Sequence, residues 1–295
     1  MFVSQGLHAN QAGRVSWLMI GLCGTLLMVP AKAQSVRLSS VDLKQGDLLV
    51  VWVESDLELE GWIGQSKLDF ARSPQKGHGW ALWGVDMDEP PGQRELVVRV
   101  GRNGPKLVKP FKVLQRSFES EEITVPTRFT EPTPELVRRM ETERKELERV
   151  LDRKSSIPLW RGRFEVPSRS TVTSPFGTRR TFNASLLSRH LGVDFRAEEG
   201  AEIGAPNGGQ VVFAAEHYLT GKTLVLDHGL GLHSIFIHLS SFEVDEGHRV
   251  SKGDLIARAG STGRTTAPHL HWSVRLSGAR VDPLALIRLE GVPED

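Results

Sequence analysis

The chain has almost no cysteine: Cys23 is the only one among its 295 residues. A single cysteine cannot form an intramolecular disulfide, so the fold must be stabilised by buried apolar surface and by any bound metal. The sequence also lacks an excess of charge, because 37 basic residues are balanced by 36 acidic ones. Such a balance provides no electrostatic steering toward nucleic acid, and we expect no nucleic-acid partner.

Long apolar runs are absent except near the N-terminus. Arg14 precedes the apolar stretch Val15–Val29, and Ala31–Ala33 follows it as a small-x-small cleavage site. This order predicts a signal peptide over residues 1–33, and the stretch is short for a membrane core of about 30 Å. Cleavage would remove Cys23 and two basic residues, so the net charge would change from +1 to −1. We therefore expect an exported protein of the periplasm or cell envelope of a bacterium, attached to a membrane only where the signal stays uncleaved.

The 262 residues that follow the expected signal are enough for two domains. Residues 34–115 contain short apolar runs separated by turn residues, which predicts an accessory domain built as a small β-sandwich of immunoglobulin-like outline. This part has no cluster of potential metal ligands or catalytic groups. Its expected role is binding, positioning or folding, with an envelope protein as a candidate partner. The expected strands are 48–53, 80–85, 96–100 and 112–114.

Residues 116–159 are expected to form a linker followed by an amphipathic helix. The linker, which runs to residue 132, contains several glutamates and prolines. Thr133 has the properties of an N-cap, and Pro134 those of a first helical residue. An apolar stripe at helical spacing should pack against one of the two domains, with a coiled-coil dimer as the alternative. The stripe consists of Leu136, Val137, Met140, Leu147, Val150 and Leu151.

Residues 160–295 are expected to form a second β domain, and the chemistry of the chain should lie there. Eight of the ten histidines occur beyond residue 189. Of these, His217 and His248 lie in turn-like contexts and are expected to be solvated, whereas His228 is expected to be a structural hydrogen-bonding group. His238, at the end of a strand, could reach a cleft. The expected strands are 210–215, 223–227, 233–238 and 255–259.

Two histidines in the last predicted strand point to a metal site. In Pro268–Leu276 polar and apolar residues alternate, so His269 and His271 lie on one face, roughly 7 Å apart along the strand. His190 and Asp194 occur on a separate segment. Two imidazoles and a carboxylate match a catalytic zinc site, which has three protein ligands and one position for water. Strand geometry alone does not say which histidine of the pair reaches the metal, and ordinary structural histidines are the alternative.

Other metal and nucleophile patterns fail on spacing. Three residues separate His190 from Asp194, unlike the His-x-Asp/Glu of an iron facial triad. After His271 no glutamate follows until Glu290, which excludes a cupin-like arrangement. Neither a His-Glu-x-x-His helix nor a Gly-x-Ser-x-Gly nucleophile elbow occurs in the sequence.

Seven short motifs follow one another in the order seen in lysostaphin-type zinc peptidoglycan endopeptidases, which the chain resembles over residues 160–288. The motifs are Ser174–Arg180, His190–Phe195, Gly204–Pro206 with Gly209–Val211, Asp227–Gly229, His238–Ser240, Gly260–Arg264 and Pro268–Trp272. The resemblance implies a compact antiparallel β-sheet with a substrate groove over its centre. The preceding β domain and helix resemble the accessory parts of periplasmic two-domain members.

The resemblance also implies roles for individual residues. His190, Asp194 and His271 are the implied zinc ligands, and His238 and His269 the implied catalytic histidines. The implied reaction is hydrolysis of amide bonds in peptidoglycan stem or cross-bridge peptides by metal-activated water, without a covalent intermediate. A non-catalytic relative that binds the wall or activates an amidase is the alternative.

Two positions depart from the family pattern. Phe236 stands in place of a frequent tyrosine, and Ser273 in place of a frequent glutamate. Neither is a ligand or catalytic position, so the departures concern the fine tuning of the site and not the presence of activity. The run before the first ligand, residues 180–189, lacks strand alternation and is expected to be a mobile flap. Asn183 in this flap, or the linker over 116–132, could occlude the metal.

Overall fold

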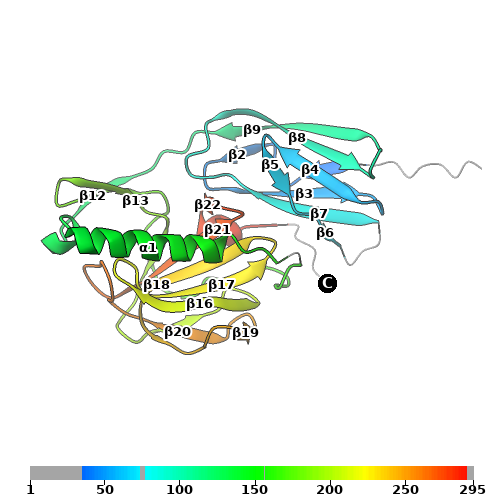
Figure 1. The fold of residues 1–295 in the computed structure, drawn as a ribbon. Helices are drawn as coiled ribbons and strands as arrows, with labels where there is room; N and C mark the ends of the chain where they lie inside the picture. Colours follow the sequence, from blue (N-terminus) through cyan, green and yellow to red (C-terminus); the bar gives the residue numbers. More distant parts are fainter. Residues whose placement is uncertain (1–34, 74–76, 156, 291–295) are drawn as a thin grey trace, which may run out of the picture. The chain divides into compact units, whose positions relative to one another are not determined.

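The computed structural model of the protein describes residues 35–290, except for residues 74–76 and 156. The expected signal peptide over residues 1–33 lies outside the described residues. The described part is mainly β and mostly antiparallel, which confirms the predicted fold class (Figure 1). Within this part, no helix combines the length and the apolar character needed to cross a membrane.

Two sheets formed by residues 36–114 enclose a common apolar core. One sheet has the order β1 (Val36–Leu38), β3 (Leu48–Glu54), β7 (His78–Gly84), β6 (Ala71–Arg72). The other has the order β2 (Asp42–Lys44), β9 (Lys106–Leu114), β8 (Gly92–Val100), β4 (Leu59–Ile63), β5 (Ser66–Leu68). Alternate residues of β3, Leu49 and Val51, are buried together with Leu96 and Val98 of β8. The four predicted strands correspond to β3, β7, β8 and β9, while the immunoglobulin-like outline stays a prediction.

A ten-stranded sheet, antiparallel at every pairing, follows in the C-terminal part. Its main path is β11 (Val172–Ser174), β14 (Gly192–Arg196), β21 (His269–Leu276), β18 (Leu232–Phe242), β17 (Gly221–Gly229), β16 (Gly209–His217), β19 (Arg249–Val250). The remaining strands are β15 (Glu202–Gly204), β20 (Leu255–Ala259) and β22 (Ala279–Val281), and the short helix α2 (Pro283–Ile287) follows them. One face of the sheet buries Phe195, Phe236 and Trp272. Trp80 of β7 joins the same apolar cluster through Trp160, with ring centroids 5.8 Å apart.

The opposite face of this sheet is covered in part by helix α1 (Pro134–Leu151) (Figure 1). As predicted, Thr133 caps the helix, accepting a hydrogen bond from the backbone nitrogen of Leu136. Val150 is buried against Val225 and Ile235, so the apolar stripe packs on the C-terminal sheet.

Two segments differ from the sequence expectation, because each contains strand structure. Residues 120–123 form β10, which pairs in parallel with β12 (Arg179–Phe182), and β12 pairs with β13 (Leu186–Arg189). The expected linker and the expected mobile flap therefore share a three-stranded sheet. The side chain of Asn183 accepts from the backbone nitrogen of Val125 and donates to its backbone oxygen, each over 2.9 Å. Asn183 thus ties the two segments together, and none of its described hydrogen bonds reaches His190, Asp194 or His271.

The turn between β12 and β13 holds two residues in the left-handed region. Asn183 has a φ of 48° and Ala184 a φ of 56°. Consecutive positive φ values define a type I′ hairpin turn, in which glycine is favoured at the second position. Alanine is disfavoured there, because its Cβ crowds the following carbonyl oxygen.

We expect Ala184→Gly to raise the free energy of unfolding by about 0.5–1 kcal/mol, since relief of a strain of roughly 1–2 kcal/mol outweighs the extra entropy of glycine in the unfolded chain. Urea denaturation of the full chain measures this change. The matched control is Ala267→Gly, also at an exposed position but without a positive φ, which should be neutral or destabilising. A lower unfolding free energy for Ala184→Gly would contradict the strain argument.

Candidate metal centre

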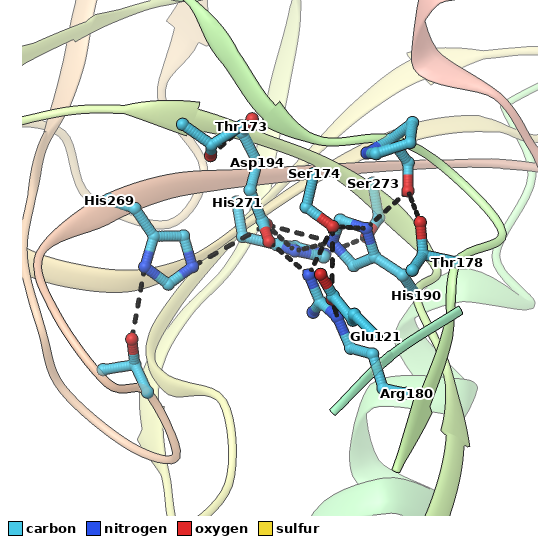
Figure 2. Close-up of polar contacts among 12 residues, drawn as sticks. Glu121, Thr173, Ser174, Thr178, Arg180, His190, Asp194, His269, His271 and Ser273 are labelled. Atoms are coloured by element: carbon cyan, nitrogen blue, oxygen red, sulfur yellow. Dashed lines mark hydrogen bonds and ion pairs between the residues drawn. The ribbon is translucent and has the colours of Figure 1, made fainter. Parts of the chain in front are cut away.

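Asp194 and His271 are brought together by the pairing of β14 with β21. Asp194 lies directly opposite His271 in this antiparallel pair. Directly opposed side chains point to the same face, with Cβ atoms about 5 Å apart. Alternation along β21 puts Leu270 and Trp272 into the core and leaves His271 on the other face. His190, just before β14, reaches the same face, so three potential ligands converge (Figure 2).

Three atoms of this cluster have a spacing close to that of metal ligands. His190 Nε2 lies 3.0 Å from His271 Nδ1 and 3.0 Å from Asp194 Oδ1, and the latter two atoms are 2.7 Å apart. All three residues are buried, and together they could hold a metal ion. Ligand atoms about 2.0–2.1 Å from a tetrahedral zinc ion are about 3.3 Å from one another, so small outward shifts would admit the ion. The donor set therefore fits a metal with three protein ligands.

Hydrogen bonds determine which nitrogen of each histidine faces the cluster. His190 Nδ1 lies 2.8 Å from the backbone oxygen of Pro175, which can only accept, so Nε2 carries the lone pair. His271 Nε2 lies 2.7 Å from Ser273 Oγ, and donation from Nε2 leaves Nδ1 free to bind. Gly192 makes this approach possible: a Cβ there would lie 2.7 Å from Ser273 Oγ and 2.8 Å from His271 Nε2. Each histidine is thus oriented by a fixed partner.

Arg180 binds the second carboxylate oxygen of Asp194. Its Nη2 donates to Asp194 Oδ2 over 2.6 Å and to Ser174 Oγ over 2.9 Å, and its Nε donates to Glu121 of β10 (Figure 2). Asp194 therefore presents a single oxygen, Oδ1, to the two histidines. Burial acts to raise the pKa of Asp194, but its contacts with His190 and His271 hold that pKa below its ordinary value. The group is a carboxylate, as a metal ligand must be.

A β-bulge turns His238 toward the cluster. Phe236 pairs with Leu224 and Leu239 pairs with Lys222 of β17, so β18 has one extra residue between these two core positions. In an unbroken strand His238 would point into the core beside Phe236. Instead it has a φ of 63°, and its ring centroid lies 5.0 Å from that of His269 and 6.2 Å from that of His271. Strained backbone of this kind is typical of functional sites.

His238 and His271 are neutral in this environment. Burial, followed by repulsion from His269 and His271, lowers the pKa of His238 to about 3. Burial lowers the pKa of His271 to about 4, although Asp194 opposes the shift. His238 Nδ1 lies 2.8 Å from the backbone oxygen of Thr262, so its Nε2 carries the lone pair. His238 Nε2 thus carries no proton, although the lowered pKa makes it a weak base in this environment.

His269 lies beside the three-residue ligand group. Its Nε2 is 3.7 Å from Asp194 Oδ1, and its Nδ1 is 2.9 Å from the backbone oxygen of Ala267. Its side chain is 20% exposed, so this ring borders solvent. The structure therefore brings together all five site residues named from the sequence: His190, Asp194, His238, His269 and His271.

His217, His228 and His248 are not part of this cluster. His228 is a structural group, as predicted, with its Nε2 2.8 Å from Ser234 Oγ. His248 is exposed, also as predicted. The prediction that His217 is solvated was wrong, because helix α1 covers it: His217 is buried, and its Nε2 lies 3.2 Å from Glu146 of α1.

Sequence reasoning missed the residues that hold the ligands in place. Ser273 had a usable signal, because it lies two residues after His271 and so shares its strand face. Arg180 belongs to the first of the motifs noted in the sequence, but its contact with Asp194 depends on the hairpin it enters. Glu121 carried no signal, since its segment was expected to be a linker.

A cavity of about 250 Å³ adjoins the cluster and is lined in part by His190, His238 and His271. Leu147 and Leu151 of α1 form one wall, and Ile235 and Ile237 of β18 contribute another. Histidines, a carboxylate and an adjoining cavity are the features of a site that binds a metal and a substrate side by side.

Residues 188–283 match Peptidase family M23. The chain carries a peptidase M23 domain. The match contains all five clustered residues and ends at the start of α2, while β10 and α1 precede it. It confirms the resemblance drawn from the sequence motifs.

Relatives and solved structures agree with this assignment. The chain is 34% identical over 115 residues to the DD-carboxypeptidase/endopeptidase Mpg of Neisseria meningitidis, covering 39% of this chain and 26% of that protein. It is 32% identical over 123 residues to the peptidoglycan DD-endopeptidase ShyA of Vibrio cholerae, covering 41% and 29%. A Pseudomonas aeruginosa protein assigned to peptidase M23 in its crystal structure has a TM-score of 0.63 and 29% identity, over 82% of this chain and 94% of that one. The chain thus aligns with about a quarter of the length of the curated relatives.

We expect Ser273→Ala to lower zinc affinity by about 10- to 100-fold, the usual effect of losing the partner of a metal-bound histidine. Without the hydroxyl, His271 Nε2 loses its fixed partner, and the tautomer that presents Nδ1 is no longer favoured. Competition with a chromophoric chelator measures the affinity.

Ser234→Ala is the matched control. It removes a buried serine hydroxyl 2.8 Å from His228, a histidine outside the cluster, so zinc affinity should stay within about 2-fold of the original protein. Equal losses in the two variants would show that Ser273 acts through general stability and not through His271.

Proposed function

We propose that the protein is a zinc-dependent endopeptidase that hydrolyses amide bonds in peptidoglycan stem or cross-bridge peptides. The observation that carries the proposal is the set of five residues in an M23 domain. His190, Asp194 and His271 have ligand spacing, and His238 and His269 adjoin them with free Nε2 atoms. Three ligands and two further histidines supply separate groups for metal binding and for proton transfer.

Zinc is the ion best suited to this donor set. Two imidazole nitrogens and one carboxylate oxygen are common zinc ligands, and the three leave a fourth position open. Bound there, zinc would lower the pKa of a water molecule toward about 7 and polarise the substrate carbonyl. Because Arg180 donates a hydrogen bond to Asp194 Oδ2, the carboxylate offers only Oδ1 as a metal ligand.

His238 and His269 move protons in the proposed mechanism. His238 is neutral and buried, and its Nε2 accepts a proton because Nδ1 is fixed by Thr262. His269 Nδ1 faces the backbone oxygen of Ala267, and its Nε2 lies 3.7 Å from Asp194 Oδ1, on the side of the ligand group. One of the two takes the proton of the attacking water, and the other stabilises the oxyanion or protonates the leaving amine. No side chain forms a covalent bond to the substrate.

The substrate class follows from the relatives, which are named as peptidoglycan DD-endopeptidase and DD-carboxypeptidase/endopeptidase. Peptidoglycan lies outside the cytoplasm, in agreement with the export expected from residues 1–33. We place the protein in the periplasm or cell envelope of a bacterium, with residues 34–115 as an accessory part that binds an envelope partner. Residues 160–295 form the proposed enzyme domain, and residues 116–159 connect the two.

The test is digestion of purified sacculi by the full chain, with the products identified by mass spectrometry. The zinc-loaded protein should release peptides with newly formed amino and carboxyl ends, and chelation should abolish the release. A protein that binds sacculi without cleaving them, or that only stimulates an added amidase, would instead support the non-catalytic alternative.

Alanine variants should divide the five residues into two classes. His190→Ala, Asp194→Ala and His271→Ala should lose both zinc and activity, because each removes a ligand. His238→Ala and His269→Ala should keep near-stoichiometric zinc while the rate falls about 10²- to 10⁴-fold, the range for a positioned acid–base group. Zinc content by mass spectrometry and peptide release by chromatography measure the two properties separately.

His248→Ala is the control, because His248 is exposed and lies outside the cluster; it should keep both properties. Should His269→Ala purify without zinc while His271→Ala retains it, the assignment within β21 is reversed.

A further inference from the structure

The cavity beside the metal centre is lined by cations and by no described acid. Its wall includes four arginines and three histidines together with apolar side chains. The arginines are Arg180, Arg189, Arg264 and Arg275. A cavity of about 250 Å³ with this lining has a strong preference for an anion.

Arg180 does not contribute to this preference, because it already has two anionic partners. It donates to Asp194 on one side and to Glu121 on the other. The positive charge of the cavity must therefore come from the remaining three arginines.

Arg264 has no acidic partner among the described residues. Its guanidinium instead lies over the ring of Phe182, 4.3 Å from the centroid. Burial, and then repulsion by Arg180, lowers the pKa of Arg264 below its ordinary value. The planar group is thus held in one orientation, with N–H donors left for a ligand.

Arg189 and Arg275 are also incompletely paired. Arg189 Nε and Nη2 are buried without a hydrogen-bond partner in the described part of the chain, and its contact with Asp88 is long, at 3.8 Å. Burial lowers the pKa of Arg275 to about 10, and its Nη1 reaches only the backbone oxygen of Gly278, at 3.4 Å. Half-buried guanidinium groups without close acidic partners retain unused hydrogen-bond donors and positive charge, so an anion that enters the cavity can pair with them.

We propose that this cavity binds a free carboxylate of the substrate peptide, with Arg264 and Arg189 as the residues that recognise it. The inference rests on the proposed function, since His190, His238 and His271 line the same cavity and place the bound group beside the bond that is cut. Guanidinium groups pair with carboxylates through two parallel hydrogen bonds, which fix orientation as well as charge. Leu147, Ile235 and Ile237 surround the aliphatic part of such a residue.

The test compares a cross-linked muropeptide dimer with the same dimer after its carboxylates are converted to carboxamides. The zinc-loaded full chain should show a kcat/KM about 10- to 100-fold higher for the free carboxylates, the effect expected of a hydrogen bond between charged groups. Two singly amidated dimers, one changed at the chain-terminal carboxylate and one at the side-chain carboxylate, identify which group is bound.

Arg264→Met should abolish this preference. It should lower kcat/KM for the free dimer by about 10- to 100-fold, leave the amidated dimer within about 2-fold, and keep the zinc content unchanged. The matched control is Arg37→Met, which removes another guanidinium 4.3 Å from an aromatic ring, that of Trp52, and should affect neither dimer. Arg189→Met provides a second variant and should weaken the preference in the same direction.

Equal cleavage of the two dimers by the original protein would overturn the carboxylate site while leaving the proposed function intact. An equal loss on both dimers in Arg264→Met would overturn the assignment to Arg264. If the protein cleaves neither dimer, isothermal titration calorimetry still measures the binding of each dimer. Tighter binding of the free dimer by a protein that cleaves neither would support the carboxylate site and refute the endopeptidase.

Discussion

The pairing of β14 with β21 is the constraint on which the metal centre depends. Because Asp194 and His271 are opposed in an antiparallel ladder, their distance is set by backbone hydrogen bonds. A shift of one residue would turn His271 into the core and Trp272 outward, so the apolar core that holds Trp272 also holds the register. Gly192 of β14 pairs with Ser273 and leaves room for the side chains of His271 and Ser273 to meet, because a Cβ at this position would contact both. The strand pairing and the core packing of the sheet therefore fix the positions of Asp194 and His271.

The two histidines proposed to move protons are positioned differently, because each lies where the regular pairing of a strand stops. His269 is the first residue of β21, and His238 sits in the bulge of β18 with a positive φ. A regular strand can present residues to one face only at every second position. The bulge brings His238 onto the face of His271, beside two residues already placed there by alternation. Strain in the backbone is thus the cost of placing an extra imidazole at the site.

The features that could be predicted from the sequence are those that depend on neighbouring residues, such as strand alternation and helix capping. Alternation in residues 268–276 predicted a strand with two histidines on one face, and Thr133 with Pro134 predicted the start of α1. The linker and flap expectations failed because Ser120–Ile123 and Leu186–Arg189 have little alternation of their own and become strands only through pairing with β12. Glu121 and Arg180 are 59 residues apart, so their contact follows from that pairing and from no motif.

The charged residues around the metal centre connect segments that are far apart in the sequence. Arg180 pairs with Asp194, and Glu121 of β10 pairs with Arg180, so a strand outside the M23 match supports a proposed ligand of the centre. This ion-pair chain also separates the cations by role: Arg180 is neutralised, whereas Arg264 and Arg189 lack close acidic partners among the described residues and face the cavity. Without Glu121, Asp194 would be the one acidic partner left to Arg180 among the contacts described, and the positive charge of Arg180 would be less fully compensated. The accessory strand therefore sets both the ligand geometry of Asp194 and the charge left for a substrate.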